Sequence, residues 1–439
     1  MSKKLGVVVA LMAVCALSIF LINCGSSSSR PSGVLYVLTQ GINGAGNSIS
    51  SFAINLGSGN LSLINSNAQT CATPNACGLP LDILLDPAGS VAFVLNQGSP
   101  CTPTPPTCTP SGTTPPTINS YNVGSDGSLS APSTAATLTA GDTAIAMTRD
   151  AAGNFLFVIT ASPQLLVYSM TPGSTSLTLA SSLTLTKAPT ALSAITFTPT
   201  GSTAAQEYLY VSNNFDYCTV GCNPQHNDNT VSAYTVSSSG TLTEQPNSPY
   251  AIAATDPISV IAVNTNPPAQ NTGGIFVYVG NQDPNGGHVY PFQVCTVVGN
   301  NGCTQIDVQN NLMTPLATCP QISCDVPPAN VGQKPVAMLV DPTNNFLYVV
   351  SEGSNTVYGF RINTTSGTFT ALTPASQPTG SQPVALALQT PVGSSPQFLY
   401  VSNSTSSNIT GFNVSTTTGF MNNPITVVSP SNPSGMVAR

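Results

Sequence analysis

Apolar runs of five to seven residues recur through most of the chain, and short polar turns separate them. The clearest copy covers residues 334–372, KPVAMLVDPTNNFLYVVSEGSNTVYGFRINTTSGTFTAL. It contains the runs VAMLV, FLYVV, TVYGFRI and TFTAL, with turn sequences DPTNN and NTTSG and a polar loop, SEGSN. Short alternating or wholly apolar runs bounded by Asp-Pro, Asn and Gly are typical of strands. The unit is therefore predicted to be a four-stranded antiparallel meander.

The core of the second predicted strand recurs seven times. The copies VLYV, VAFV, FLFV, YLYV, FVYV, FLYV and FLYV begin at residues 34, 91, 155, 208, 276, 346 and 398. Seven copies of a four-stranded unit, repeated at these intervals, predict an all-β, seven-bladed β-propeller that forms one domain over residues 34–439. A solenoid would need shorter units and capped ends. The first copy lacks a first strand, and the C-terminal PSGMVAR matches the start of one, so we expect it to complete the first blade.

The composition agrees with an all-β fold and limits the partners. Charged residues make up 5% of the chain, against roughly 25% in an average soluble protein. Ser, Thr and Asn fill the polar positions, and the 36 Gly and 38 Pro favour turns over helices. With only 8 Lys and Arg and a net charge of −7, the chain has no basic patch for nucleic acid.

The N-terminus has the pattern of an export signal. Lys3 and Lys4 precede an apolar run over residues 5–22, and the following LINCG resembles the lipobox of bacterial lipoproteins, although Asn23 departs from it. We therefore expect a signal peptide over residues 1–24 ending at Cys24, the lipidated residue, and a flexible tether over residues 25–33. An uncleaved membrane anchor and an ordinary signal peptide are the alternatives. The expected location is the bacterial envelope, lipid-anchored and outer-membrane or periplasm-facing.

The remaining cysteines fall into close pairs. An even number of paired cysteines on an exported chain predicts disulfides that close small loops. A metal site is the weaker interpretation, because the pairs lie far apart and the chain has only two His. The predicted pairs are Cys71 with Cys77, Cys101 with Cys108, Cys218 with Cys222, Cys295 with Cys303, and Cys319 with Cys324.

The repeat also carries a family resemblance. Its pattern, P-x-A-hydrophobic-x-x-D-P-x-x-x-F-L-Y-V followed by N-x-V, F-x-I and G-x-(L/F), resembles that of bacterial lactonase-type and YVTN-repeat seven-bladed propellers. The resemblance covers residues 34–439 and rests on core and turn positions. It implies either a phosphogluconolactonase-like enzyme or a binding protein of the envelope, since one fold supports several functions.

In a four-stranded meander successive loops alternate between the two faces of the ring, and this alternation places the long insertions on one face, here called the top face. Loops between second and third strands, and between blades, emerge there, including residues 66–78, 97–117, 212–229 and 314–333. These loops contain four of the five cysteine pairs. Elaborated loops on a rigid scaffold favour a binding module as the first functional hypothesis. Its neutral loops suit a glycan, a peptide or another envelope protein.

A lactonase-like hydrolase is the second hypothesis, and a structural or adhesive protein is the third. The candidate catalytic residues belong to the neighbouring blades five and six and are His288, Glu352, Lys334 and Asp256. We expect them to meet at the channel mouth, where a base and a cation among them would hydrolyse a lactone. No Arg is placed on the top face to bind a substrate phosphate. We expect no cofactor and no metal, because nucleotide-binding and EF-hand motifs are missing.

Overall fold

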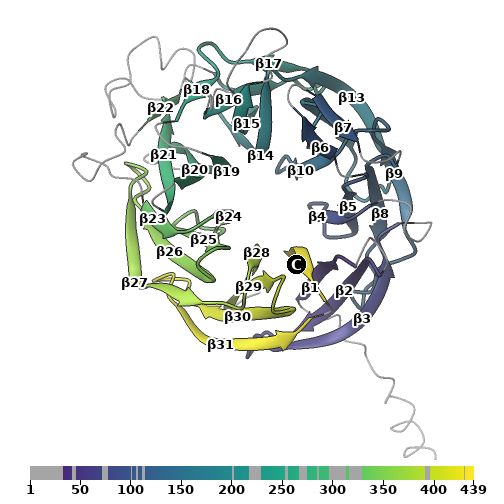
Figure 1. Ribbon diagram of the computed structural model, residues 1–439. Helices are drawn as coiled ribbons and strands as arrows, with labels where there is room; N and C mark the ends of the chain where they lie inside the picture. The colour runs from purple at the N-terminus through teal and green to yellow at the C-terminus, as the bar shows by residue number, and fades with distance from the viewer. Residues whose placement is uncertain are drawn as a thin grey trace, which may run out of the picture.

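Seven antiparallel sheets surround a central axis in the computed structural model, with the first strand of each sheet innermost (Figure 1). The predicted seven-bladed β-propeller is confirmed, and the described elements are all strands. We number the blades 1 to 7 in the chain order of their second strands. The structure describes residues 33–41, 46–71, 78–99, 101–104, 107–110, 114–199, 202–216, 229–252, 256–265, 274–283, 286–295, 313–315, 329–390, 396–429 and 431–439.

The innermost strands line the channel, and their side chains are mostly aliphatic or small. Many of these side chains are only half-buried, because one edge of each innermost strand pairs with no further strand. From blade 1 to blade 7 these strands are β32 (Pro433–Ala438), β4 (Pro80–Leu85), β10 (Ala144–Arg149), β14 (Lys187–Phe197), β19 (Pro257–Asn264), β24 (Pro335–Val340) and β28 (Pro383–Gln389).

The second strands are buried on both faces, which explains their continuous apolar sequences. They are β1 (Val34–Thr39), β5 (Val91–Asn96), β11 (Phe155–Thr160), β15 (Gln206–Asp216), β20 (Ile275–Asp283), β25 (Phe346–Ser351) and β29 (Gln397–Asn403). The third strands are β2 (Ser48–Ile54), β8 (Thr117–Asn122), β12 (Gln164–Met170), β16 (Thr230–Val236), β21 (Gly286–Val294), β26 (Thr356–Ile362) and β30 (Asn408–Val414).

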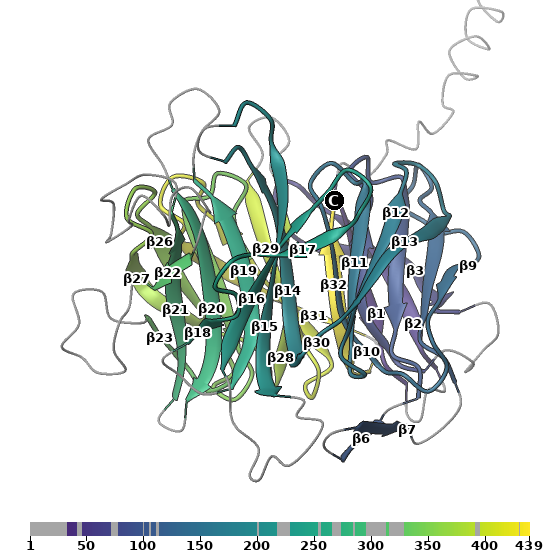
Figure 2. The same ribbon diagram turned by 90° about the horizontal axis from the view of Figure 1, so that it is seen from above.

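The outermost strands alternate more and are more exposed. They are β3 (Leu61–Gln69), β9 (Ser133–Thr137), β13 (Leu177–Thr184), β17 (Leu242–Glu244), β22 (Met313–Pro315), β27 (Phe369–Pro378) and β31 (Met421–Val428). Short strands β18 (Tyr250–Ala251) and β23 (Ala329–Gly332) also pair with the third strands of blades 4 and 5. Between β5 and β8, a hairpin of β6 (Cys101–Thr104) and β7 (Thr107–Pro110) forms where the sequence predicts only a loop (Figure 2).

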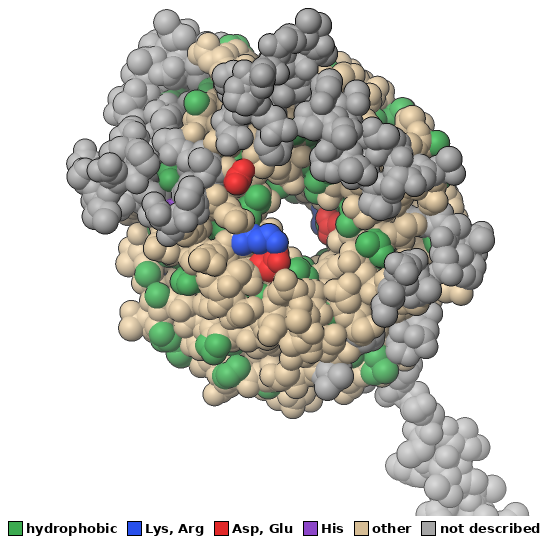
Figure 3. Space-filling view, in the orientation of Figure 1, with side chains coloured by type: hydrophobic (Ala, Val, Ile, Leu, Met, Phe, Trp, Pro, Cys, Tyr) green, Lys and Arg blue, Asp and Glu red, His purple; other side chains and the backbone are tan. Residues whose placement is uncertain are grey.

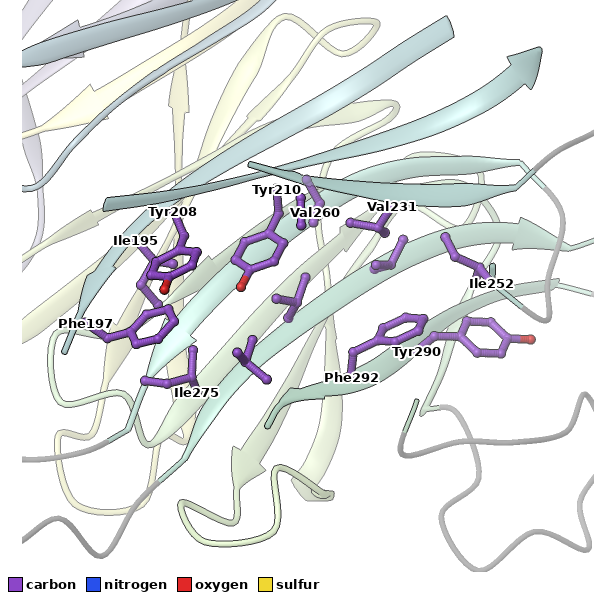
Figure 4. Close-up of a cluster of buried hydrophobic side chains, with 14 residues drawn as sticks. Ile195, Phe197, Tyr208, Tyr210, Val231, Ile252, Val260, Ile275, Tyr290 and Phe292 are labelled. Carbon is purple, nitrogen blue, oxygen red and sulfur yellow. The ribbon is translucent and has the colours of Figure 1, made fainter. Parts of the chain in front are cut away.

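The hydrophobic core divides into seven clusters, one between each pair of adjacent blades. Figure 4 shows the cluster between blades 4 and 5, where the rings of Phe197 and Tyr208 stack with centroids 4.2 Å apart. Each blade therefore buries one face against each neighbour, so no single blade contains a core of its own.

Buried tyrosines of four second strands tie their blades to the next. The hydroxyl of Tyr348 donates to the carbonyl of Gly419 at 2.8 Å, in the turn between the third and fourth strands of blade 7. Gly419 has a φ of 71°, and a Cβ there would lie 2.3 Å from the ring of Phe346. This contact explains why the repeat ends in a turn glycine. The equivalent bonds join Tyr36 to Gly127, Tyr278 to Gly367, and Tyr400 to Gly59.

The ends of the described chain meet in blade 1. The C-terminal strand β32 pairs with β1, with Tyr36 opposite Val437, and the backbones of Val34 and Arg439 exchange two hydrogen bonds of 3.2 and 2.9 Å. The predicted closure of the ring by the C-terminus is therefore confirmed. In the part of the chain that the structure describes, no helix is long and apolar enough to cross a bilayer.

Candidate active site at the channel mouth

The entry turns of four innermost strands form part of the channel mouth on the top face. In each, a non-glycine residue stands directly before the first proline of the strand and has a positive φ. Its carbonyl accepts a hydrogen bond from a residue at or just after the end of the second strand, as the Lys334 carbonyl does from Glu352 N–H at 2.9 Å. This shared turn brings two side chains together at the rim. The four residues are Asp256, Lys334, Gln382 and Asn432.

Lys334 and Glu352 form an ion pair at this turn in blade 6. The Lys334 Nζ lies 2.6 Å from the Glu352 Oε2, and the side chains are 45% and 16% exposed. Figure 3 shows the opening through the ring, with basic and acidic side chains at its rim and within it. A carboxylate that is largely shielded and held beside a cation is chemically suited to activate water next to a developing negative charge. The structure thus joins two of the four predicted residues.

The other two predicted residues lie apart from this pair. Asp256 occupies the equivalent turn of the neighbouring blade 5, where its carbonyl accepts a hydrogen bond from Gln282 N–H. His288 belongs to the third strand, β21, and β20 separates it from the innermost strand. There it contacts Tyr290 edge-on, with ring centroids 6.2 Å apart. Asp256 is therefore near the rim, whereas His288 lies outside the channel wall. Their catalytic roles remain predictions.

Asp82, on the innermost strand of blade 2, is not among the four candidate catalytic residues predicted from sequence. The structure places it inside β4, at a β-bulge that recurs in six blades. At the position that corresponds to Asp82, the other five blades have only Ala or Ser, so the acid is peculiar to blade 2 among them. A comparison of the repeats at this position would have revealed it. The small residues are Ala146, Ala191, Ser259, Ala337 and Ala385.

The carboxylate of Asp82 spans the gap between two innermost strands. Its Oδ1 accepts a hydrogen bond of 2.8 Å from Ile83 N–H, and the carboxylate also accepts one from Met147 N–H on β10. Neither strand pairs with another strand on the channel side, so this carboxylate forms part of the channel wall. Burial raises the pKa of Asp82 to about 6, although both backbone hydrogen bonds oppose the shift.

The arginines are held at the opposite, bottom face of the ring. Arg149 donates to the Leu85 carbonyl at 2.7 Å and to the Asp150 carbonyl. Burial lowers the pKa of this guanidinium, and the nearby carboxylates of Asp150 and Asp86 oppose that shift. Arg361 lies over the Phe346 ring and donates to the Thr417 carbonyl, and Arg439 donates to the Gly89 carbonyl. The sequence-based placement of these three arginines away from the top of the channel agrees with these contacts.

Several predictions fall on residues whose structure is not described. These include Cys24, the signal peptide and most of the tether, and at least one cysteine of every predicted pair except Cys101 with Cys108. Cys101 and Cys108 lie on the paired strands β6 and β7, where Cys101 is opposite Pro110 and Cys108 is opposite Pro103. Within the described residues, no three His, Cys, Asp or Glu side chains group as metal ligands. The disulfides, like the lipid anchor, remain predictions.

One family model matches part of the chain. Residues 316–432 match the family described as lactonase, seven-bladed β-propeller, and this segment contains both Lys334 and Glu352. Among curated proteins, none matches this sequence. The chain is a seven-bladed β-propeller, and its residues 316–432 are similar to the lactonase family that its repeat resembles.

Solved structures with the same fold cover nearly the whole chain. A putative 6-phosphogluconolactonase from Bacteroides fragilis has a TM-score of 0.60 at 14% identity, covering 95% of this chain and 100% of its own. The periplasmic gluconolactonase of Pseudomonas aeruginosa has a TM-score of 0.59 at 17% identity, covering 92% and 98%. A protein from Lactobacillus plantarum has a TM-score of 0.60 at 14% identity, covering 93% and 99%. At these identities the similarity shows the fold. The family match favours the hydrolase hypothesis over the binding module.

Proposed function

We propose that this protein is a lactone hydrolase whose active site is the channel mouth at blade 6. The observation that carries the proposal is the Lys334–Glu352 ion pair, because it lies at the rim and inside the segment that matches the lactonase family. The similar structures of a putative 6-phosphogluconolactonase and of a gluconolactonase support the same class of reaction. In this proposal the binding module, our first hypothesis from sequence, is replaced by its alternative.

The ion pair supplies the two groups that ester hydrolysis needs. The Glu352 carboxylate removes a proton from water, and the water oxygen bonds to the carbonyl carbon of the lactone. The Lys334 ammonium stabilises the negative charge that develops on the carbonyl oxygen. The bond between the acyl carbon and the ring oxygen then breaks. The ring oxygen takes up a proton, and the product is a hydroxy acid.

Export and lipid anchoring belong to the same proposal. Val34 and Arg439 pair at the bottom end of β1 and β32, so a tether that precedes residue 33 joins the ring on the face opposite the mouth. Figure 2 shows the C-terminus near one face of the ring and the β6–β7 hairpin near the other. A propeller anchored through Cys24 would therefore direct its channel mouth away from the membrane, toward diffusible substrates.

The test is hydrolysis of a panel of sugar lactones by residues 33–439, purified under oxidising conditions. We expect turnover above the spontaneous rate, and a loss of about 100-fold or more in kcat/KM for Glu352→Gln, since removing a general base typically costs that much. Glu244→Gln is the matched control, because Glu244 is exposed on the outer strand β17. Turnover that survives Glu352→Gln, or no turnover by folded protein, would overturn the proposal.

A further inference from the structure

We propose that the channel site accepts uncharged lactones and rejects phosphorylated ones. This inference rests on the proposed lactone hydrolase function and specifies the substrate class of the same site. It depends on where the few cations of the chain lie, and on which carboxylates share the channel with Lys334.

The position of every Lys and Arg side chain in the propeller is known. After residue 30 the sequence contains five Lys and Arg, and the structure describes all of them. The loops that are not described contain no Lys or Arg, so they bring no further cation to the top face. Three of the five are the arginines held by backbone carbonyls at the bottom face. Only Lys187, which begins β14, and Lys334 belong to the top end of the innermost strands.

Carboxylates outnumber these two lysines at the same end. Glu352 already pairs with Lys334. Asp256 stands in the adjacent rim turn, and Asp82 lies in the wall of the channel. Asp142 precedes β10 and accepts hydrogen bonds from Thr143 and Ser162 N–H. Four carboxylates against two lysines leave the site with a net negative charge.

A phosphate group would meet unfavourable electrostatics in this channel. It carries a charge of about −1.5 to −2 near pH 7 and is normally bound by Arg forks, Lys or a helix N-terminus. The described residues contain no helix, and the channel end holds no Arg. A plain sugar lactone presents only hydroxyls and a ring ester. The carboxylates can accept hydrogen bonds from such hydroxyls without repulsion.

The test compares one sugar δ-lactone with its 6-phosphate ester, using residues 33–439. We expect kcat/KM for the plain lactone to be at least about 10-fold higher, and this preference to shrink in high salt, because salt screens exposed charges. Asp256→Lys is the diagnostic variant. Lys334 already occupies the equivalent rim turn of blade 6 with a φ of 57°, so this turn accommodates lysine. We expect Asp256→Lys to shift the ratio about 10-fold toward the phosphorylated lactone.

Glu244→Lys makes the same change in net charge on the outer strand β17 and is expected to leave the ratio unchanged. An equal or better rate with the phosphorylated lactone would overturn the inference and leave the hydrolase standing. A ratio shifted as much by Glu244→Lys as by Asp256→Lys would also overturn it. Hydrolysis of neither lactone by folded protein would instead overturn the hydrolase, and the inference with it.

Discussion

Two aspartates on the same short segment of blade 2 have opposite environments. Asp82 lies within β4 at the channel wall, and Asp86 follows the strand at the bottom face. The backbone N–H groups of Val91, Gly173 and Ser90 and the Ser90 hydroxyl surround the Asp86 carboxylate. Burial alone would raise the pKa of Asp86, but these hydrogen bonds outweigh it and lower the pKa. For Asp82 burial prevails and the pKa rises to about 6.

This difference in hydrogen bonding separates acids that stabilise the fold from acids that are available for chemistry in the channel. An acid whose charged form is fully hydrogen-bonded stabilises a turn, and Asp341 does the same in blade 6, accepting from Asn345 and Phe346 N–H. An acid that is buried with fewer donors holds its proton more tightly and destabilises the fold when ionised. The bottom of the ring contains acids of the first kind, and the channel contains Asp82.

The largest expected effect is on Asp86. We expect Asp86→Ala to lower the free energy of unfolding by about 3 kcal/mol, because it leaves one buried and several part-buried donors without their acceptor. The Gly173 N–H among them belongs to blade 3, so the loss also weakens the contact between two blades. Urea denaturation at pH 7 measures the change. Asp126→Ala is the matched control in an exposed turn, and an equally large loss there would contradict the comparison.

Asp82→Asn is expected to act in the opposite direction. The folded-state pKa of Asp82 lies above its unfolded value of about 4, so the folded state binds more protons between pH 4 and 6, and stability falls as pH rises through that window. Removing the ionisable group should raise the free energy of unfolding by about 1–2 kcal/mol at pH 7.5, with little change at pH 4. Denaturation at both pH values measures this. An equal destabilisation at both would show that Asp82 acts like Asp86.

The smallest expected effect on stability is at the rim. Lys334→Gln places at blade 6 the residue that blade 7 has in its equivalent turn, Gln382. The ion pair is partly exposed, so its loss should change the free energy of unfolding by less than about 0.5 kcal/mol. We expect kcat/KM for an uncharged lactone to fall about 10-fold or more in the same variant. A large loss of stability with unchanged hydrolysis would make the pair structural.

The fold could be predicted from sequence because every blade repeats the same pattern. The buried second strands are continuous apolar runs, the turn acids follow the first strands, and PSGMVAR matches the beginning of KPVAMLV. The β6–β7 hairpin was missed, since its threonines and prolines read as loop. The alternation of loops between the two faces predicts that Lys334 and Glu352 lie on the same face, and they do, because both belong to the same repeat.

The rest of the site depends on contacts between repeats. His288 was predicted at the mouth because its blade is adjacent, yet a third strand lies away from the channel, and the alternation of loops says nothing of that distance. Asp82 stands where the other five blades with the same bulge have Ala or Ser. A comparison of the repeats shows that this acid has no counterpart in those blades, but its contact with the Met147 N–H of the next blade and its burial cannot be read from the sequence.

The most direct test of the account is a crystal structure of residues 33–439 with a non-hydrolysable lactam analogue of an uncharged sugar lactone. The account predicts that the analogue lies at the channel mouth, with its carbonyl oxygen near the Lys334 ammonium and its carbonyl carbon facing the Glu352 carboxylate. An analogue bound elsewhere on the propeller, or an empty channel at saturating concentration, would contradict it.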